Sequence, residues 1–272
     1  MLRSLKELES YKVSAINGEV GKVTDFLFDD QHWTARYLVT DTSGFWEVSN
    51  QVLISPISFR SVDWSTRLFQ VALTQEKVKK SPSVDLAKPV SRQYEREYSH
   101  YYGWPYYWGF AGSWAWGMGP YPLALADRST KGETARTQET NDDPHLRSVN
   151  AVIGYHVHGT DGEIGHIADF IMDDETWTIR YLVIDTSNWW IGKKVLVAPH
   201  WANKISWSEK MVYVALTREA IKSSPEWTQT ALVEREFEER LYSHYSRPPY
   251  WLRRELEDKA GDQPEAERHL AL

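Results

Sequence analysis

The stretch from Gly18 to Thr42, GEVGKVTDFLFDDQHWTARYLVTDT, returns from Gly162 to Thr186 as GEIGHIADFIMDDETWTIRYLVIDT. The two stretches align without a gap at an offset of 144 positions, and 15 of the 25 aligned residues are identical. Five of the ten differences exchange one apolar residue for another. Repetition of this kind predicts two copies of one folding unit in a single chain.

Hydrophobic patterning predicts six short strands in each copy. Those of the first copy cover residues 11–16, 19–29, 33–41, 52–54, 59–64 and 68–73. The second of these strands carries apolar residues on both faces, which suits a curled sheet or a small barrel. In the third strand, Trp33, Ala35, Tyr37 and Val39 share one face, and we expect that face to be core.

After Thr42 the copies diverge, and they realign at an offset of 143 positions. Each copy then continues into helix. Thr74 and Thr217 are placed to N-cap a short helix, 75–80 in the first copy and 218–222 in the second. Longer trailing helices are predicted over 91–100 and 231–244, and both copies carry Tyr-Ser-His-Tyr near the end of this helix, at 98–101 and 242–245.

The composition is that of a globular protein without a general nucleic-acid footprint. The chain has 272 residues, 42% of them apolar, and a formal net charge of −7. It has no cysteine, which excludes disulfides, thiolate metal sites and cysteine nucleophiles. The N-terminus lacks the apolar core of a signal peptide, so we expect a cytoplasmic protein, with peripheral contact to the inner face of the membrane as an alternative.

The repeated stretch resembles the PRC-barrel family. The resemblance rests on the motif Gly18-x-x-Gly21-x-Val23-x-Asp25-Phe26-x-Phe28-Asp29, followed by the Arg36–Val39 strand and the Val52–Pro56 strand. It returns from Gly162 to Pro199, so that it covers most of residues 10–80 and 153–225.

The resemblance implies a small, strongly bent antiparallel β-barrel that serves as a docking surface. Similar barrels of this family form the cytoplasmic domain of the photosynthetic reaction-centre H subunit and the C-terminal domain of ribosome-maturation factors. This chain lacks the single N-terminal transmembrane helix of the former and the separate N-terminal barrel domain of the latter. A fold does not carry a function with it.

Several polar groups could carry chemistry, and each also has a structural interpretation. Asp25 and Asp29-Asp30, with their counterparts Asp169 and Asp173-Asp174, are expected to bond backbone amides, because they lack the spacing of a calcium loop. Arg36 and Arg180 are expected to form structural ion pairs with an acidic residue of a neighbouring strand, with anion or partner recognition as the alternative.

Two histidine patterns are candidates for catalytic or metal sites. His156 and His158 share one strand face, as a metal pair would, but Lys12 and Ser14 stand at these positions in the first copy. Ser99-His100 and Ser243-His244 are sequence neighbours that point apart on a helix. We therefore predict no catalytic residue, no cofactor and no metal ligand.

Aromatic residues between and within the copies are the candidate binding surface. Residues 101–126 contain no charge but many rings, interrupted by glycine and proline, which argues against a spanning helix. This segment is expected to fold back over the barrels, or to contact a partner or a membrane surface. The residues proposed for partner binding are Trp46, Trp104, Trp108, Trp114, Trp116, Trp189 and Trp190.

The sequence thus predicts a mainly β protein made of two PRC-like barrels packed as a pseudo-two-fold pair, with the trailing helices filling the seam. The predicted organisation is a first domain at 1–100 that opens with a short lead-in, an aromatic segment and polar linker at 101–150, a second domain at 151–258 and a flexible tail at 259–272. The expected function is a non-enzymatic adaptor that docks a protein partner or self-associates, without nucleic acid. A peripheral membrane or reaction-centre-type assembly factor is the first alternative, and a metal-dependent hydrolase is the second.

Overall fold

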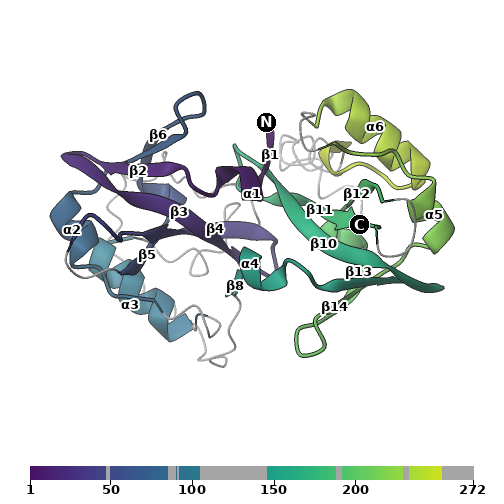
Figure 1. Cartoon of the computed structure of the whole chain (residues 1–272), viewed down its shortest axis with the longest axis horizontal. Helices are drawn as coiled ribbons and strands as arrows, with labels where there is room; N and C mark the ends of the chain where they lie inside the picture. The colour runs from purple at the N-terminus through teal and green to yellow at the C-terminus, as the bar shows by residue number, and fades with distance from the viewer. Residues whose placement is uncertain are drawn as a thin grey trace, which may run out of the picture.

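Two seven-stranded β-sheets form most of the molecule, which is mainly β as predicted (Figure 1). The computed structural model describes residues 1–46, 50–84, 90, 92–104, 146–187, 192–228 and 233–252. Of the predicted binding residues, Trp108, Trp114, Trp116, Trp189 and Trp190 lie outside these ranges, as do most of the aromatic segment and the predicted tail.

The first sheet is built from six consecutive strands. They are β2 (Lys12–Ala15), β3 (Gly18–Asp29), β4 (Thr34–Asp41), β5 (Gln51–Ile54), β6 (Phe59–Asp63) and β7 (Leu68–Val71). Their spatial order is β5-β4-β3-β2-β7-β6. The paired neighbours are antiparallel except β2 and β7, which are parallel. All six lie within one or two residues of the strands expected from the patterning.

The second sheet is built from the strands of the second half. They are β9 (His156–Gly159), β10 (Gly162–Asp173), β11 (Ile179–Asp185), β12 (Lys194–Val197), β13 (Ala202–Ser206) and β14 (Met211–Val214). The order is β12-β11-β10-β9-β14-β13, with β9 and β14 parallel. Within the described ranges, β5 and β6 end the path of the first sheet, and β12 and β13 end the path of the second. Closure into barrels stays a prediction.

The seventh strand of each sheet comes from the other half of the chain. Strand β1 (Leu2–Ser4) pairs antiparallel with β10, and β8 (Leu146–Ser148) pairs antiparallel with β3. Residues 1–10, expected to be a lead-in, therefore complete the second sheet, because their backbone groups find partners there. Strand β8 falls within 101–150, the range expected to be linker. The shared tripeptide Leu-Arg-Ser, at an offset of 144, was the sequence signal for both strands.

Short helices cap the strands, and longer ones lie at the two ends of the molecule (Figure 1). The elements are α1 (Leu5–Leu8), 3-10 helix η1 (Pro56–Ser58), α2 (Gln75–Lys79), α3 (Arg92–Tyr102), α4 (Val149–Val152), 3-10 helix η2 (Pro199–Trp201), α5 (Arg218–Lys222) and α6 (Arg235–His244). The predicted caps are confirmed, because the Thr74 hydroxyl accepts from the Lys77 amide and the Thr217 hydroxyl from the Ala220 amide.

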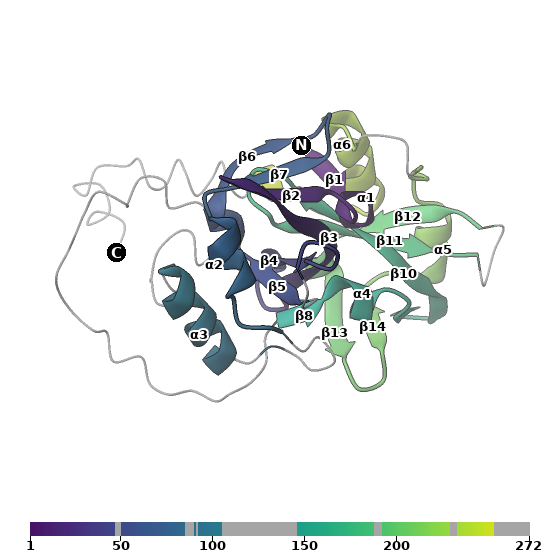
Figure 2. The same cartoon turned by 60° about the vertical axis from the view of Figure 1, so that its left-hand side comes forward.

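The trailing helices do not fill the seam between the sheets, which corrects the prediction. Helix α3 packs beside its own sheet, where the Tyr98 hydroxyl accepts from the amide of Leu53 in β5 at 3.2 Å. Figure 2 shows α2 and α3 together on the outer side of the first half. The seam is formed instead by the exchanged strands, whose backbone hydrogen bonds join the halves directly.

The repeated tetrapeptide Tyr-Ser-His-Tyr also misleads by one residue. In the first half the Tyr101 hydroxyl donates to the Lys77 carbonyl at 2.8 Å, and in the second half His244 Nε2 donates to the Ala220 carbonyl at 2.7 Å. Tyr101 corresponds to His244, and Lys77 to Ala220, at an offset of 143 positions, whereas the tetrapeptides align at an offset of 144. Residues at equivalent positions of the two helices are therefore related by the offset of 143 that holds for the preceding strands. The identical tetrapeptides occupy positions that differ by one residue.

β-bulges bend the long central hairpins. The pairing of β3 with β4 shifts between Leu27 and Phe28, so that Arg36 is the extra residue of β4, and Arg180 is placed likewise in β11. A bulged residue is unpaired, and its side chain is re-aimed. Gly21 allows a further close approach, because a Cβ there would lie 2.2 Å from the carbonyl oxygen of Asp41.

The core extends over both faces of the central strands. Every residue of β4 before Asp41 is buried, so the face opposite Tyr37 is core as well as the face that was predicted. Trp33 lies outside the strand, in the preceding turn, with a φ of 53°. Within the described part of the chain, no helix is long and apolar enough to cross a bilayer.

Candidate functional site

The two sheets meet through a direct backbone pairing of their central turns. The Ala35 amide donates to the Trp177 carbonyl at 2.8 Å, and the Ile179 amide donates to the Trp33 carbonyl at 2.6 Å. Thr34 and Thr178 form the bridge between these two bonds. Because both bonds are reciprocal, the turns hold the two tryptophans at matching positions on opposite sides of the seam.

A buried carboxylate locks each exchanged strand in place. Asp169 accepts a hydrogen bond from the Ser4 hydroxyl at 2.5 Å and from the Lys6 amide at 3.1 Å. Ser4 also N-caps α1, so its hydroxyl serves both the cap and the seam. Burial raises the pKa of Asp169, and the hydrogen bonds from Ser4 and the backbone oppose that rise.

The same arrangement recurs on the other side of the seam. Asp25 accepts from the Ser148 hydroxyl at 2.5 Å and from the Asn150 amide at 3.1 Å. Ser148 N-caps α4, and burial raises the pKa of Asp25. The two aspartates do bond backbone amides, as predicted, but in part the amides belong to the opposite half of the chain.

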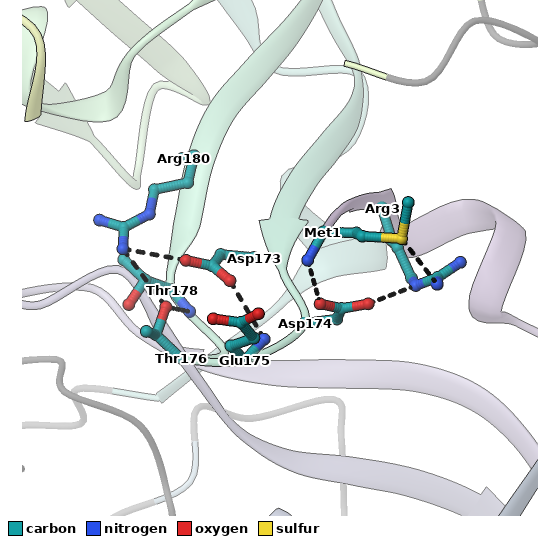
Figure 3. Close-up of polar contacts among 8 residues, drawn as sticks. All are labelled: Met1, Arg3, Asp173, Asp174, Glu175, Thr176, Thr178 and Arg180. Atoms are coloured by element: carbon teal, nitrogen blue, oxygen red, sulfur yellow. Dashed lines mark hydrogen bonds and ion pairs between the residues drawn. The ribbon is translucent and has the colours of Figure 1, made fainter. Parts of the chain in front are cut away.

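An arginine from each exchanged strand bridges the halves. Arg3 Nε lies 2.7 Å from Asp174 Oδ2 (Figure 3). The Arg3 guanidinium also stacks on Trp64, with its Cζ 3.7 Å from the ring centroid. Arg147 Nε lies 2.9 Å from Asp30 Oδ2 and 4.4 Å, measured from its Cζ, from the ring centroid of Trp207.

The bulged arginines form the structural ion pairs that were predicted. Arg36 Nη2 lies 3.4 Å from Asp29 Oδ2, and Arg180 Nη2 lies 3.1 Å from Asp173 Oδ2 (Figure 3). Burial alone would raise the pKa of Asp29, but the charges of Arg36 and His32 lower it below its usual value. The pKa of Asp173 is lowered in the same way by Arg180.

A hollow of about 330 Å³ opens beside this seam. Asp30 and Trp33 line it from the turn after β3, and the segment from η2 through β13 lines it from the other half, through Pro199, Ala202, Asn203, Lys204, Ile205 and Trp207. Trp33 and Trp207 are both half-buried, and both line the hollow. The site therefore combines aromatic walls with a carboxylate and an amine at its edge.

The matching position on the other side of the seam is filled. Trp177 is 0% exposed, and it contacts Phe59 at 5.2 Å and Phe69 at 6.2 Å between ring centroids. At the offset of 143, Ala202 stands for Phe59 and Val212 for Phe69. Two missing rings therefore account for the hollow beside Trp33.

The two described residues of the predicted aromatic surface lie away from this hollow. Trp104 stacks on Tyr102, with ring centroids 4.2 Å apart and planes at 9°. Trp46 is half-buried against the core and forms a bridge with Ser43. The ring-bearing residues of the hollow, Trp33 and Trp207, were not singled out from the sequence for binding. The signal that was available is the loss of ring size from Phe59 to Ala202.

The histidine pairs are placed as follows. His156 Nδ1 lies 2.8 Å from Glu163 Oε1, and His158 Nδ1 bonds the carbonyl oxygen of Gly159 at 2.7 Å. Among the described residues, no group of three or more metal-ligating side chains could hold an ion. His244 bonds the end of α5 and Ser99 is buried, which places these helix-end residues in packing contacts.

A buried acid that the sequence reasoning missed lies on the inner face of α6. Glu238 is 3% exposed, and the Tyr181 hydroxyl donates to its Oε1 at 2.6 Å. Arg235 Nη1 lies 3.1 Å from its Oε2. Burial raises the pKa of Glu238, and it raises the pKa of Tyr181 as well. This cluster ties the trailing helix to β11.

Comparison with known families supports one part of the chain directly. Residues 145–221 match the family model described as the PRC-barrel domain. The match begins one residue before β8 and runs to within α5, so it covers all strands contributed by the second half. No curated protein matches the chain. Residues 145–221 are thus similar to the PRC-barrel domain, a module often involved in protein interactions.

Proposed function

We propose that the protein is a non-enzymatic interaction module made of two PRC-barrel units in tandem, which docks a protein partner at the hollow beside Trp33. The observation that carries the proposal is this hollow, with half-buried Trp33 and Trp207 held on a rigid seam. Exposed aromatic rings in a preformed depression are typical of interface anchors.

Duplication is supported by the matching strand orders and the reciprocal contacts. Asp25 and Asp169 differ by the same offset as their partners Ser148 and Ser4. Reciprocal contacts of this kind are those expected of an isologous, two-fold interface, and they support this part of the proposal. Because the exchanged strands make each sheet depend on the other half, we expect one cooperative unfolding transition in urea by circular dichroism. Two widely separated, independent transitions would contradict the shared pair of units.

Docking at the hollow is tested with a charge reversal at its rim. Lys204 is exposed on β13, and its counterpart on β6 is the exposed Ser61. After a partner has been identified by cross-linking and purified, Lys204→Glu should weaken its binding by at least about tenfold, a loss typical of an interface position. The matched control Ser61→Glu should leave the dissociation constant within about threefold.

Self-association is the form of docking in which the partner is a second copy. Sedimentation velocity over a range of concentrations would detect it, and Lys204→Glu should then shift the equilibrium toward monomer while Ser61→Glu does not. If neither a purified partner nor a second copy binds in a way that Lys204→Glu weakens, the docking function is wrong.

A peripheral membrane or electron-transport assembly role is a second candidate, favoured only by the uncharged aromatic segment 101–126. Co-sedimentation with anionic liposomes, with and without that segment, tests it. Binding that disappears with the segment would favour this role over docking at the seam.

A further inference from the structure

The hollow and the filled site across the seam differ in a way that indicates what the hollow receives. We propose that it takes an aromatic side chain of a protein partner, accompanied by an acidic group that faces Lys204. This inference rests on the proposed docking function and names the chemistry of the partner's anchor.

The filled site serves as an internal template for the occupant. Phe59 meets Trp177 edge-on, with ring centroids 5.2 Å apart and planes at 67°. This is a favoured geometry for aromatic pairs. The template shows that a phenyl ring at this position fits against the turn tryptophan, which Phe59 and Phe69 together enclose.

The backbone around the missing ring is the same in both halves. Phe59 is paired with Val71 across β6 and β7, and Ala202 is paired with Val214 across β13 and β14. Both strands carry a register shift directly after this pair. Ala202 therefore occupies the place of Phe59, and a ring supplied by a partner would occupy the space beyond the Ala202 methyl group.

The walls of the hollow favour an aromatic ring over an aliphatic chain. Trp33 stacks on Phe28 at 5.3 Å with planes at 16°, so one of its faces is already covered within the protein. Arg147 lies over the ring of Trp207 and holds it in place. What remains available to a ligand is the rest of the Trp33 ring, together with the Trp207 and Ile205 side chains in the lining.

The charges at the rim indicate the second element of the anchor. The charge of Asp30 is balanced by Arg147, whose Nε lies 2.9 Å away. Lys204 is exposed at the rim, and its Nζ lies 5.6 Å from the ring centroid of Tyr213. An amine on an aromatic face remains available for a carboxylate, so an acidic residue next to the aromatic anchor would meet it.

The inference is tested by nuclear magnetic resonance with blocked dipeptides as probes. N-acetyl-Asp-Phe-amide should shift the indole signals of Trp33 and Trp207 in a saturable way, and N-acetyl-Asp-Leu-amide should bind at least about threefold more weakly. Replacing Asp by Asn in the probe should weaken binding to the wild type but not to Lys204→Glu.

The decisive variant is Ala202→Phe, which supplies the ring from within. It should weaken binding of the Asp-Phe probe by at least about tenfold. Ala202→Leu serves if the first variant does not fold, as judged by the dispersion of the amide spectrum. Unchanged probe binding in the folded variants, or no saturable shift in the wild type at about 10 mM probe, overturns the inference.

The outcomes for the anchor and for the docking function can be told apart. A partner that binds through Lys204 but is indifferent to Ala202→Phe leaves docking standing and removes the aromatic anchor. A probe that binds in the hollow, in a protein for which no partner or second copy binds, leaves the ring site standing and removes docking.

Discussion

The two sides of the seam have the same backbone plan but different interiors. On one side Trp177 is enclosed by Phe59 and Phe69, and on the other Trp33 borders an open hollow next to Ala202. The contrast shows that the same turn can hold its tryptophan either enclosed by rings or beside an open hollow. A position that is filled by aromatic rings on one side of the seam is thereby left open on the other.

The elements that hold the halves together do not differ in this way. Asp25 and Asp169, with the serines that donate to them, are the same on both sides. The two sides of the seam therefore have the same residues where the exchanged strands are bound. They differ at the surface, where Phe59 on one side corresponds to Ala202 on the other. Substitutions at the two kinds of position should give effects of different size.

Phe59→Ala should give the largest effect, because it empties the filled site. Loss of the ring would expose Trp177 and leave a cavity, at a cost of about 3–5 kcal/mol of unfolding free energy. Urea denaturation followed by tryptophan fluorescence measures it. A loss below about 1 kcal/mol would show that Phe59 does not support the core as the structure indicates.

Asp25→Ala and Asp169→Ala come next. Each removes the acceptor of a serine hydroxyl and of backbone amides, so each should lower the unfolding free energy by about 2–3 kcal/mol, and by similar amounts. Asp41→Ala, at a half-buried turn carboxylate, is the control and should cost less than about 1 kcal/mol. Unequal losses at the two seam aspartates would break the equivalence of the two sides.

Ala202→Phe should have a smaller effect of opposite sign. If the hollow matches the filled site, the new ring should stabilise the protein by about 1 kcal/mol, since it buries apolar area without displacing a neighbour. Thermal denaturation by calorimetry measures the change. A loss of more than about 2 kcal/mol would mean that the ring is overpacked and that the two sites differ in shape.

Glu238→Gln tests the contribution of the buried acid in α6 to the pH dependence of the unfolding free energy. Burial raises the folded-state pKa of Glu238, so the folded chain holds this proton to higher pH than the unfolded chain, whose value is near 4.5. The wild-type unfolding free energy should therefore fall as pH rises from about 4.5 to the folded-state pKa, and level off above it. The variant should lack this component, and an unchanged slope in urea titrations would contradict it.

Most of the strands could be predicted from local patterning, because each hairpin carries its own turn and its own apolar alternation. The bulges that place Arg36 and Arg180 could not, since they depend on a partner strand. The exchange of β1 and β8 between the sheets could not be predicted either, because local sequence does not determine which sheet a three-residue strand will join. The Leu-Arg-Ser repeat would have shown that the two strands are equivalent, but not that they cross.

The site was less predictable than the fold. Tryptophan content drew attention to loops such as the one at Trp46, while Trp33 was assigned to the core because it begins an alternating strand. Trp177 adopts the same left-handed turn and is buried, so the small residue at Ala202 is the difference that leaves Trp33 beside an open hollow. Long-range packing of this kind is visible only when both halves are compared side by side.

The crossed strands have a consequence for how the protein is made. The Ser148 hydroxyl that engages Asp25 lies 123 positions later in the chain. The first half therefore emerges from the ribosome before β8 can pair with the end of β3, at Leu27 to Asp29. Contacts between residues so distant in sequence form slowly. A nascent first half would present the edge of β3 at these residues to other strands in the interval. The time needed to synthesise the chain up to Leu146–Ser148 is thus the period in which β3 of the nascent chain can pair with a wrong strand.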